Sequence, residues 1–313
     1  MPISSLRLGT RRSALALWQA NEVARLLEPL AEPRRIDLVE LDTHGDRDQA
    51  SALSTMGGFG VFTKAIQLAL LDDRADVAVH SLKDLPTVPT EGTVLAATPR
   101  RGPTGDAFVS KRFRRFDDLP YGATVGTSSL RRRAQLLNRR PDLKLVELRG
   151  NVATRLRKLN DLDLDGIVLA EAGLVRLELD DRIAEVLDED WMLPAVGQGA
   201  IGLECRERDS GTRDLVDGMN DLDTWNCIRA ERAMLAALGG GCLIPIGATT
   251  RIAGGRLTIR GAVLNGDGSR RIVATHEGEA SAPLATGQEL AAKLILEGAN
   301  ELLATCRIEP NPS

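Results

Sequence analysis

The chain has 313 residues, 43% hydrophobic and 27% charged, a composition typical of globular proteins with two or three domains. No apolar run approaches the roughly 18 to 20 residues of a membrane-spanning helix, so no membrane span is expected. The net charge of −4 argues against a nucleic-acid-binding domain, which is usually basic overall, although arginines cluster in the middle of the chain.

The N-terminal third alternates short apolar runs with amphipathic stretches, a pattern typical of βα units with parallel strands. Ser13 should cap a helix that runs to Leu27, and a further helix should follow the glycine-rich loop MGGFG. Strands are expected at residues 6–10, 36–41 and 76–81.

A second unit follows with the same pattern. Its strands are expected at residues 106–110, 123–127, 144–148 and 166–170, with arginine-rich helices after the second and third of these strands. Residues 194–206 should bend into a strand that carries the chain back to the first unit. The sequence therefore predicts two α/β lobes of the periplasmic-binding-protein type, 1–99 plus 200–217 and 105–194, around a cleft where ligands bind at strand carboxyl ends.

The C-terminal part, residues 220–313, has a different pattern. A helix striped by Trp225 and Ile228 should end at a run of three glycines. Three strands separated by AGG and NGDG turn signals indicate an antiparallel meander, and a last helix is expected over 283–305. This pattern predicts a smaller α+β domain with a three-stranded antiparallel sheet.

Arginines and hydroxyl side chains gather where strands of the second lobe end. Helix N-terminal N–H groups with hydroxyls can hold an anion, and guanidinium groups bind carboxylates or phosphates in a bidentate manner. The candidates in this lobe are Thr127, Ser129, Arg131, Arg132, Arg149 and Arg155. By contrast, Arg133, Arg139, Arg140 and Arg157 are interpreted as solvated helix-surface residues.

The first lobe has similar residues after two of its strands. The candidates for binding are Arg11, Ser13, Ser81 and Lys83. Asp84 next to Lys83 is either one half of an ion pair or a carboxylate that stabilises a cationic intermediate and moves a proton. His80 lies in a strand, which favours a structural role.

Cys242 follows three glycines and precedes the sequence LIP, so it lies on a loop. A loop thiol can be a nucleophile, a redox sensor or a covalent anchor, and only the anchor needs no neighbouring base. The other cysteines, Cys205, Cys227 and Cys306, are interpreted as core residues. With no CxxC pair and no Cys/His cluster, neither a disulfide framework nor a metal site is expected.

Together these segments resemble the porphobilinogen deaminase family over essentially the whole chain. The matching stretches are TRRSALALWQ, THGD, GVFTK, DVAVHSLKDLP, DAFVS, VGTSSLRRRAQL, LRGNVATRL, PAVGQGAIGLECR, AERAMLAALGGGC and PIGA. The resemblance implies that Cys242 carries a dipyrromethane cofactor through a thioether. It also implies that four porphobilinogen units are condensed head to tail with loss of ammonia, and that hydroxymethylbilane is released for tetrapyrrole and heme biosynthesis.

The resemblance also implies roles for individual residues. Asp84 would be catalytic, stabilising the positive charge that forms when ammonia leaves. The cofactor-binding set would be Ser13, Lys83, Asp84, Ser129, Arg131 and Arg132. The substrate-binding set would be Arg11, Ser13, Arg149 and Arg155, with Ser81, Thr127 and Gln198 as weaker members. A cytoplasmic monomer that binds no metal, nucleic acid or membrane is expected.

The sequence departs from the family pattern in the glycine-rich loop and just after it. Phe59 and Thr55 stand where lysines are common, and Ala65 replaces a usual glutamate. Together these changes lower the net positive charge of this segment, so we expect activity with altered affinity or elongation.

Two other classes of protein fit parts of the sequence. A two-lobed solute receptor would share the fold, but it would need no loop cysteine and would usually carry a signal peptide, which the sequence does not indicate. A nucleic-acid binder would use the arginine runs, but 3% aromatic residues leave few stacking platforms. An added mass of two linked pyrroles on Cys242 would distinguish the enzyme from both of these other classes.

Overall fold

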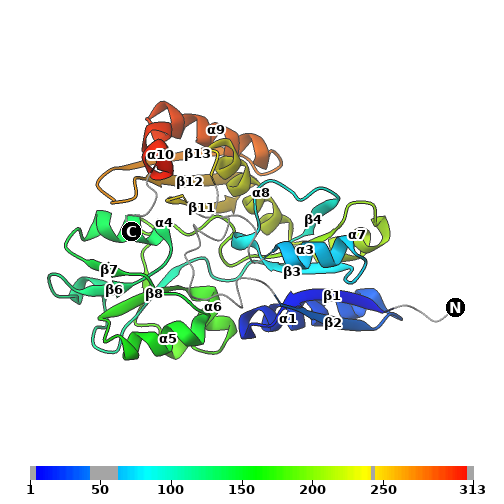
Figure 1. Ribbon diagram of the computed structural model, residues 1–313. Coiled ribbons are helices and arrows are strands. Elements are labelled where there is room, and N and C mark those ends of the chain that lie inside the picture. Colours follow the sequence, from blue (N-terminus) through cyan, green and yellow to red (C-terminus); the bar gives the residue numbers. More distant parts are fainter. Residues whose placement is uncertain (1–4, 43–62, 241–243, 309–313) are drawn as a thin grey trace. The chain divides into compact units, whose positions relative to one another are not determined.

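The structure, a computed structural model, describes residues 5–42, 63–240 and 244–308. None of the helices in this described part combines the length and apolarity that a membrane crossing requires. Figure 1 shows the described helices and strands coloured along the sequence.

The chain divides into two compact units. The first comprises residues 1–102 and 199–225, and the second comprises residues 103–198 and 226–313. Residues 199–206 therefore belong to the same compact unit as the N-terminal strands. The second unit contains both an α/β sheet and the C-terminal sheet, so the division into three domains stays a prediction.

The first unit is a five-stranded sheet of order β2-β1-β3-β10-β4 with helices on both faces. Its elements are β1 (Leu6–Arg11), α1 (Ala14–Ala31), β2 (Ile36–Leu41), α3 (Lys64–Leu71), β3 (Val77–Ser81), the short 3-10 turn η1 (Leu82–Asp84), β4 (Thr93–Ala97), β10 (Ile201–Arg206) and α7 (Ser210–Asp217).

Alternation along β3 explains the two packed faces of this sheet. Val77 and Val79 point to one face, where they join a core with Val23 and Leu27 of α1. Ala78 points to the other face and packs against α3. A strand buried on both sides reads as a continuous apolar run, which is why the sequence shows it clearly.

The α/β sheet of the second unit has the order β7-β6-β8-β5-β9. Its elements are β5 (Asp106–Val109), η2 (Phe116–Asp118), β6 (Thr124–Gly126), α4 (Leu130–Arg139), β7 (Lys144–Val146), α5 (Val152–Asp161), β8 (Gly166–Ala170), α6 (Glu171–Arg176), η3 (Asp180–Arg182) and β9 (Glu185–Leu187). Phe108 packs with Leu136 of α4 on one face, and Ile167 packs with Leu156 of α5 on the other.

The expected parallel arrangement holds for β1, β2 and β3 in the first unit but is wrong for β5 in the second, and each sheet contains antiparallel strand pairs. β10 is antiparallel to β3 and β4, and β5 is antiparallel to β8 and β9. β6, β7 and β8 are parallel, as are β1, β2 and β3. An antiparallel strand begins at the sheet edge where its parallel neighbours end, and this places its first residues beside the predicted sites.

The C-terminal part has the expected antiparallel meander β11-β12-β13. Its elements are α8 (Leu222–Ala237), β11 (Ile246–Ala253), β12 (Arg256–Leu264), β13 (Arg271–Glu279), α9 (Pro283–Leu296) and α10 (Ala299–Ile308). Figure 1 shows α9 and α10 covering one face of this sheet, where Leu290 and Leu302 join its core. The last helix is interrupted, because Gly298 has φ 98°, which helical residues do not adopt. The predicted α+β architecture is confirmed.

Candidate anion-binding site

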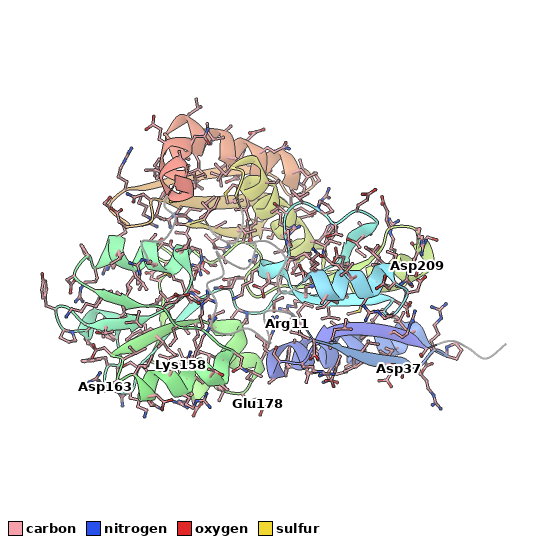
Figure 2. All side chains as sticks on the ribbon, in the orientation of Figure 1. Arg11, Asp37, Lys158, Asp163, Glu178 and Asp209 are labelled. Carbon is pink, nitrogen blue, oxygen red and sulfur yellow. The ribbon has the colours of Figure 1, made fainter. Side chains whose placement is uncertain are left out.

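Arg11 and Ser13 lie where β1 turns into α1, as Figure 2 shows for Arg11. The Ser13 hydroxyl caps this helix by accepting a hydrogen bond from the Ala16 amide at 3.3 Å. Its O–H can still donate to a ligand, because a hydroxyl both accepts and donates.

Ser81, Lys83 and Asp84 reach the same edge of the first sheet from β3. β1 and β3 are parallel neighbours, so their carboxyl ends lie side by side. The Ser81 hydroxyl bonds the Gln19 side chain of α1 at 3.0–3.1 Å. Lys83 and Asp84 follow on η1, which is fixed by a 3.0 Å hydrogen bond from the Leu82 amide to the Ala200 carbonyl. Asp84 is half-buried, so it does not simply face solvent.

A buried polar cluster lies directly behind this edge. His80 Nε2 is 2.9 Å from Glu204 Oε2 of β10, and both side chains are almost fully buried. Thr93 Oγ1 and Gln67 Nε2 donate to the same carboxylate at 2.6 and 3.0–3.1 Å. Burial alone would raise the pKa of Glu204, but the hydrogen bonds, led by that with His80, hold it below its ordinary value. This cluster supports the structural interpretation of His80.

In the second unit, Thr127 and Ser129 lie between β6 and α4. Ser129 caps α4 by accepting from the Arg132 amide at 3.4 Å, and its own amide donates to Thr127 Oγ1 at 3.2 Å. The hydroxyls therefore order the first turn of the helix that carries Arg131 and Arg132.

Arg131 and Arg132 are buried around one carboxylate that the sequence analysis did not single out. Asp106, the first residue of β5, accepts from Arg131 Nη1 at 2.6 Å and from Arg132 Nε and Nη2 at 2.9 and 2.7 Å. Burial would raise the pKa of Asp106, but the two guanidinium charges hold it far below its usual range. The three side chains are at most 5% exposed, and together they carry one net positive charge.

Gln198 belongs to the same cluster. Its side-chain amide donates to Asp106 Oδ1 at 3.0 Å and to the carbonyls of Thr104 and Gly105 at 2.7 and 3.1 Å. Gln198 is fully buried, and these hydrogen bonds give it a role in holding Asp106. Its prediction as a substrate contact stays untested.

Arg149 and Arg155 lie at the neighbouring strand end, after β7 and on the first turn of α5. Arg149 Nε bonds Glu147 at 2.6 Å, and Lys158 Nζ donates to the Arg149 carbonyl at 3.1 Å. β6 and β7 are parallel neighbours, so this junction lies at the same sheet edge as Ser129. The structure thus gathers the candidates of each unit at one edge of its own sheet.

Three predicted features lie outside the described residues: Cys242, Thr55 and Phe59. The chain on either side of Cys242 is well anchored. Gly239 ends α8 with φ 62°, and Ile244 packs against the C-terminal core. Ala65 lies on α3 and is half-buried.

Buried arginines, helix caps and hydroxyls at the strand edges are typical of an α/β protein that binds anions. A family model described as "Porphobilinogen deaminase, dipyromethane cofactor binding domain" matches residues 6–214, and the C-terminal domain of the same family matches residues 225–296. The chain belongs to the porphobilinogen deaminase family. That family consists of hydroxymethylbilane-synthesising transferases of tetrapyrrole biosynthesis, so the family and enzyme class expected from the sequence are confirmed.

Curated relatives match almost end to end. Porphobilinogen deaminase of Syntrophotalea carbinolica is 49% identical over 312 residues, covering 100% of this chain and 99% of the relative. That of Acidithiobacillus ferrooxidans is 48% identical, covering 97% of this chain and 98% of the relative. Among solved structures, the methionine binding protein MetQ is 15% identical with a TM-score of 0.46, covering 70% of this chain and 90% of that one. The BvgS VFT2 domain of Bordetella pertussis is 16% identical with a TM-score of 0.43, covering 68% and 85%.

The cluster around Arg131 fits the cofactor that the family model names. Arg131 Nε is buried and has no hydrogen-bond partner among the described residues. A buried donor without a partner is costly, and a net positive charge away from water favours a bound anion. Each pyrrole of the cofactor carries carboxylates, which would supply both the charge and the acceptor that the cluster lacks.

Proposed function

We propose that this chain condenses four porphobilinogen units head to tail, with loss of ammonia, and releases hydroxymethylbilane. The growing chain is primed by dipyrromethane attached through a thioether to Cys242. The observation that carries this proposal is the buried Arg131–Arg132–Asp106 cluster, because its net charge and unpartnered Nε match a carboxylate ligand. It lies in a chain that belongs to the family throughout.

The cationic and hydroxyl side chains at the two sheet edges would bind the carboxylates of the cofactor and the substrate. Arg131, Arg132 and Ser129 would hold cofactor carboxylates in the second unit, with Ser13, Lys83 and Asp84 in the first. The substrate carboxylates would be held by Arg11, Ser13, Arg149 and Arg155, with Ser81, Thr127 and Gln198 as lesser contacts. The cofactor supplies the pyrrole on which the product grows.

Asp84 provides the charge that the reaction needs. When ammonia leaves porphobilinogen, positive charge develops on the substrate, and a carboxylate within reach of the ring nitrogens stabilises it and can accept a proton. η1 holds Asp84 at the edge where Arg11 and Ser13 lie, and its half-buried position limits competition from water.

Intact-protein mass spectrometry tests the proposal. The wild-type protein should carry the added mass of two linked pyrroles, and Cys242→Ala should lose both this mass and hydroxymethylbilane formation from porphobilinogen. Cys306→Ala, which changes a half-buried thiol of α10, should keep both. A wild-type protein that forms no hydroxymethylbilane with the adduct in place would contradict the proposal.

The proposal also covers the oligomeric state, the location in the cell and the binding of nucleic acid. We expect a cytoplasmic monomer with no affinity for nucleic acid, since the overall charge is −4 and two of the clustered arginines of α4, Arg131 and Arg132, are paired with Asp106 within the protein. Analytical ultracentrifugation checks the oligomeric state. Binding to duplex DNA that weakens steeply with salt would overturn the exclusion of nucleic acid.

A further inference from the structure

Asp106 is a buried carboxylate that touches both arginines of the proposed cofactor site. Oδ2 accepts from Arg131, whereas Oδ1 accepts from Arg132 twice and from Gln198 once. Four charge-assisted or amide donors on one carboxylate leave it little freedom, and its side chain is 0% exposed. Asp106 therefore has no room to serve as a ligand contact itself.

The remaining contacts fix where the guanidinium groups point. Arg132 Nη1 donates to the Val168 carbonyl at 3.1 Å, and Arg131 Nη1 donates to the Leu193 carbonyl. Gln135 holds Leu193 from both sides, donating to its carbonyl at 3.0 Å and accepting from its amide at 2.9 Å. The donors on the Asp106 side are thereby engaged, whereas the Nε of Arg131 is not.

The net charge of Arg131, Arg132 and Asp106 determines which ligand the two arginines can bind. Two adjacent buried guanidinium groups repel each other, and Asp106 neutralises one of the two charges. One positive charge is left for a ligand, which matches one carboxylate better than two.

We infer that Asp106 is a positioning residue that orients Arg131 and Arg132 and limits the pair to one ligand carboxylate, with Gln198 holding Asp106 in turn. This inference rests on the proposed function. It concerns how the cofactor is loaded and held, and it assigns Asp106 no contact with the reacting atoms.

The test compares Asp106→Asn with a matched control, Asp142→Asn. Asp142 also pairs with an arginine of this unit, Arg140, at 2.7 Å, and it accepts from the Gly122 amide at 2.9 Å. The arginine that Asp142 pairs with is Arg140, and not Arg131 or Arg132. Both variants are purified as full chains, and the fraction carrying the two-pyrrole mass is measured before and after incubation with porphobilinogen.

Asp106→Asn keeps the shape of the side chain but removes the charge. We expect cofactor loading to slow by about 100-fold, as for other misplaced binding groups. We also expect the difference in Tm between loaded and unloaded protein to change, whereas Asp142→Asn should lower both Tm values equally and load normally. Equal loading of Asp106→Asn and wild type, with an unchanged Tm difference, would overturn the inference.

A milder variant covers the case in which Asp106→Asn does not fold. Gln198→Leu keeps the charges of Asp106 and both arginines but removes the amide that donates to Asp106 and to the Thr104 and Gly105 carbonyls, so loading should slow by a smaller factor than in Asp106→Asn. Normal loading of Gln198→Leu in a soluble protein would then count against the inference. If the wild type itself carries no two-pyrrole mass, the proposed function fails before the role of Asp106 is tested.

Discussion

Asp84 owes its position to three local features of the chain. β3 ends at Ser81, the Leu82 amide bonds the Ala200 carbonyl, and the single turn η1 then presents Lys83 and Asp84 at the sheet edge. Side chains placed on a short turn after a buried strand are held more firmly than those on a long loop. The strand, the hydrogen bond and the turn thus hold Asp84 in a fixed position, which a catalytic role would require.

Replacing Asp84 by Asn should remove the negative charge while keeping size and shape. We expect kcat for hydroxymethylbilane formation to fall by about 100-fold or more with little change in KM, because the charge acts on the transition state. Steady-state kinetics on protein loaded with cofactor, as judged by its mass, provides the measurement. Asp37→Asn, at an exposed position of β2 that Figure 2 labels, is the control. An unchanged kcat for Asp84→Asn would exclude this role.

The sequence predicts where most strands lie, but it does not predict the direction in which each strand runs in its sheet. Periodicity and turn signals locate β1, β3 and the C-terminal meander closely, because each is a local pattern. Direction depends on partners far along the chain, so the antiparallel β5 and β10 could not be derived. Had β5 been parallel, Asp106 would lie at the edge opposite Ser129. The one local sign of a special role for Asp106 was that it is an isolated acidic residue directly before the apolar run AFV.

The same limit applies to the arginines. Their clustering after β6 predicts an anion-binding junction, but the sequence cannot say which of them already has a partner inside the protein. Arg140, interpreted as solvated, is held by Asp142 and by the Leu119 carbonyl at 3.2 Å. Arg133 and Arg157 are exposed, as expected.

The cluster of His80 and Glu204 joins four elements, since Gln67 lies on α3 and Thr93 on β4. Glu204→Gln should destabilise the first unit by about 2 kcal/mol, because one amide oxygen cannot replace two carboxylate oxygens that accept four hydrogen bonds. Urea unfolding followed by circular dichroism measures the loss.

The exposed Glu207, which follows β10, gives the matched control. Glu207→Gln should change the free energy of unfolding by less than about 0.5 kcal/mol. Equal midpoints for the two variants would show that the buried cluster does not stabilise the unit.

Across the molecule, three buried carboxylates share one electrostatic property. Asp76, Asp106 and Glu204 all have pKa values below their ordinary range in the folded protein, because arginine or hydrogen-bond partners outweigh burial. The unfolded chain therefore binds more protons than the folded chain in acid. Stability should fall as the pH drops below about 4, although the net charge of −4 gives no hint of it.

Asp76 is the position where this can be measured in a single variant. Its carboxylate bonds Arg7 and the buried Arg206 at 2.8 Å each, joining β1, the start of β3 and the end of β10. Burial would raise the pKa of Asp76, but these bonds lower it from 3.8 to about 2. A shift of this size corresponds to about 2 kcal/mol of stability, present above pH 4 and lost as the pH falls toward 2.

Asp76→Asn should therefore be less stable than wild type at pH 7 by about 2 kcal/mol, and the two proteins should converge near pH 2. The convergence follows because a protonated aspartate, like asparagine, no longer attracts the guanidinium groups. Urea midpoints measured from pH 7 to pH 2 provide the comparison, with Asp37→Asn tracking wild type throughout. A constant gap between Asp76→Asn and wild type over this range would show that the loss comes from packing and not from the charge of Asp76.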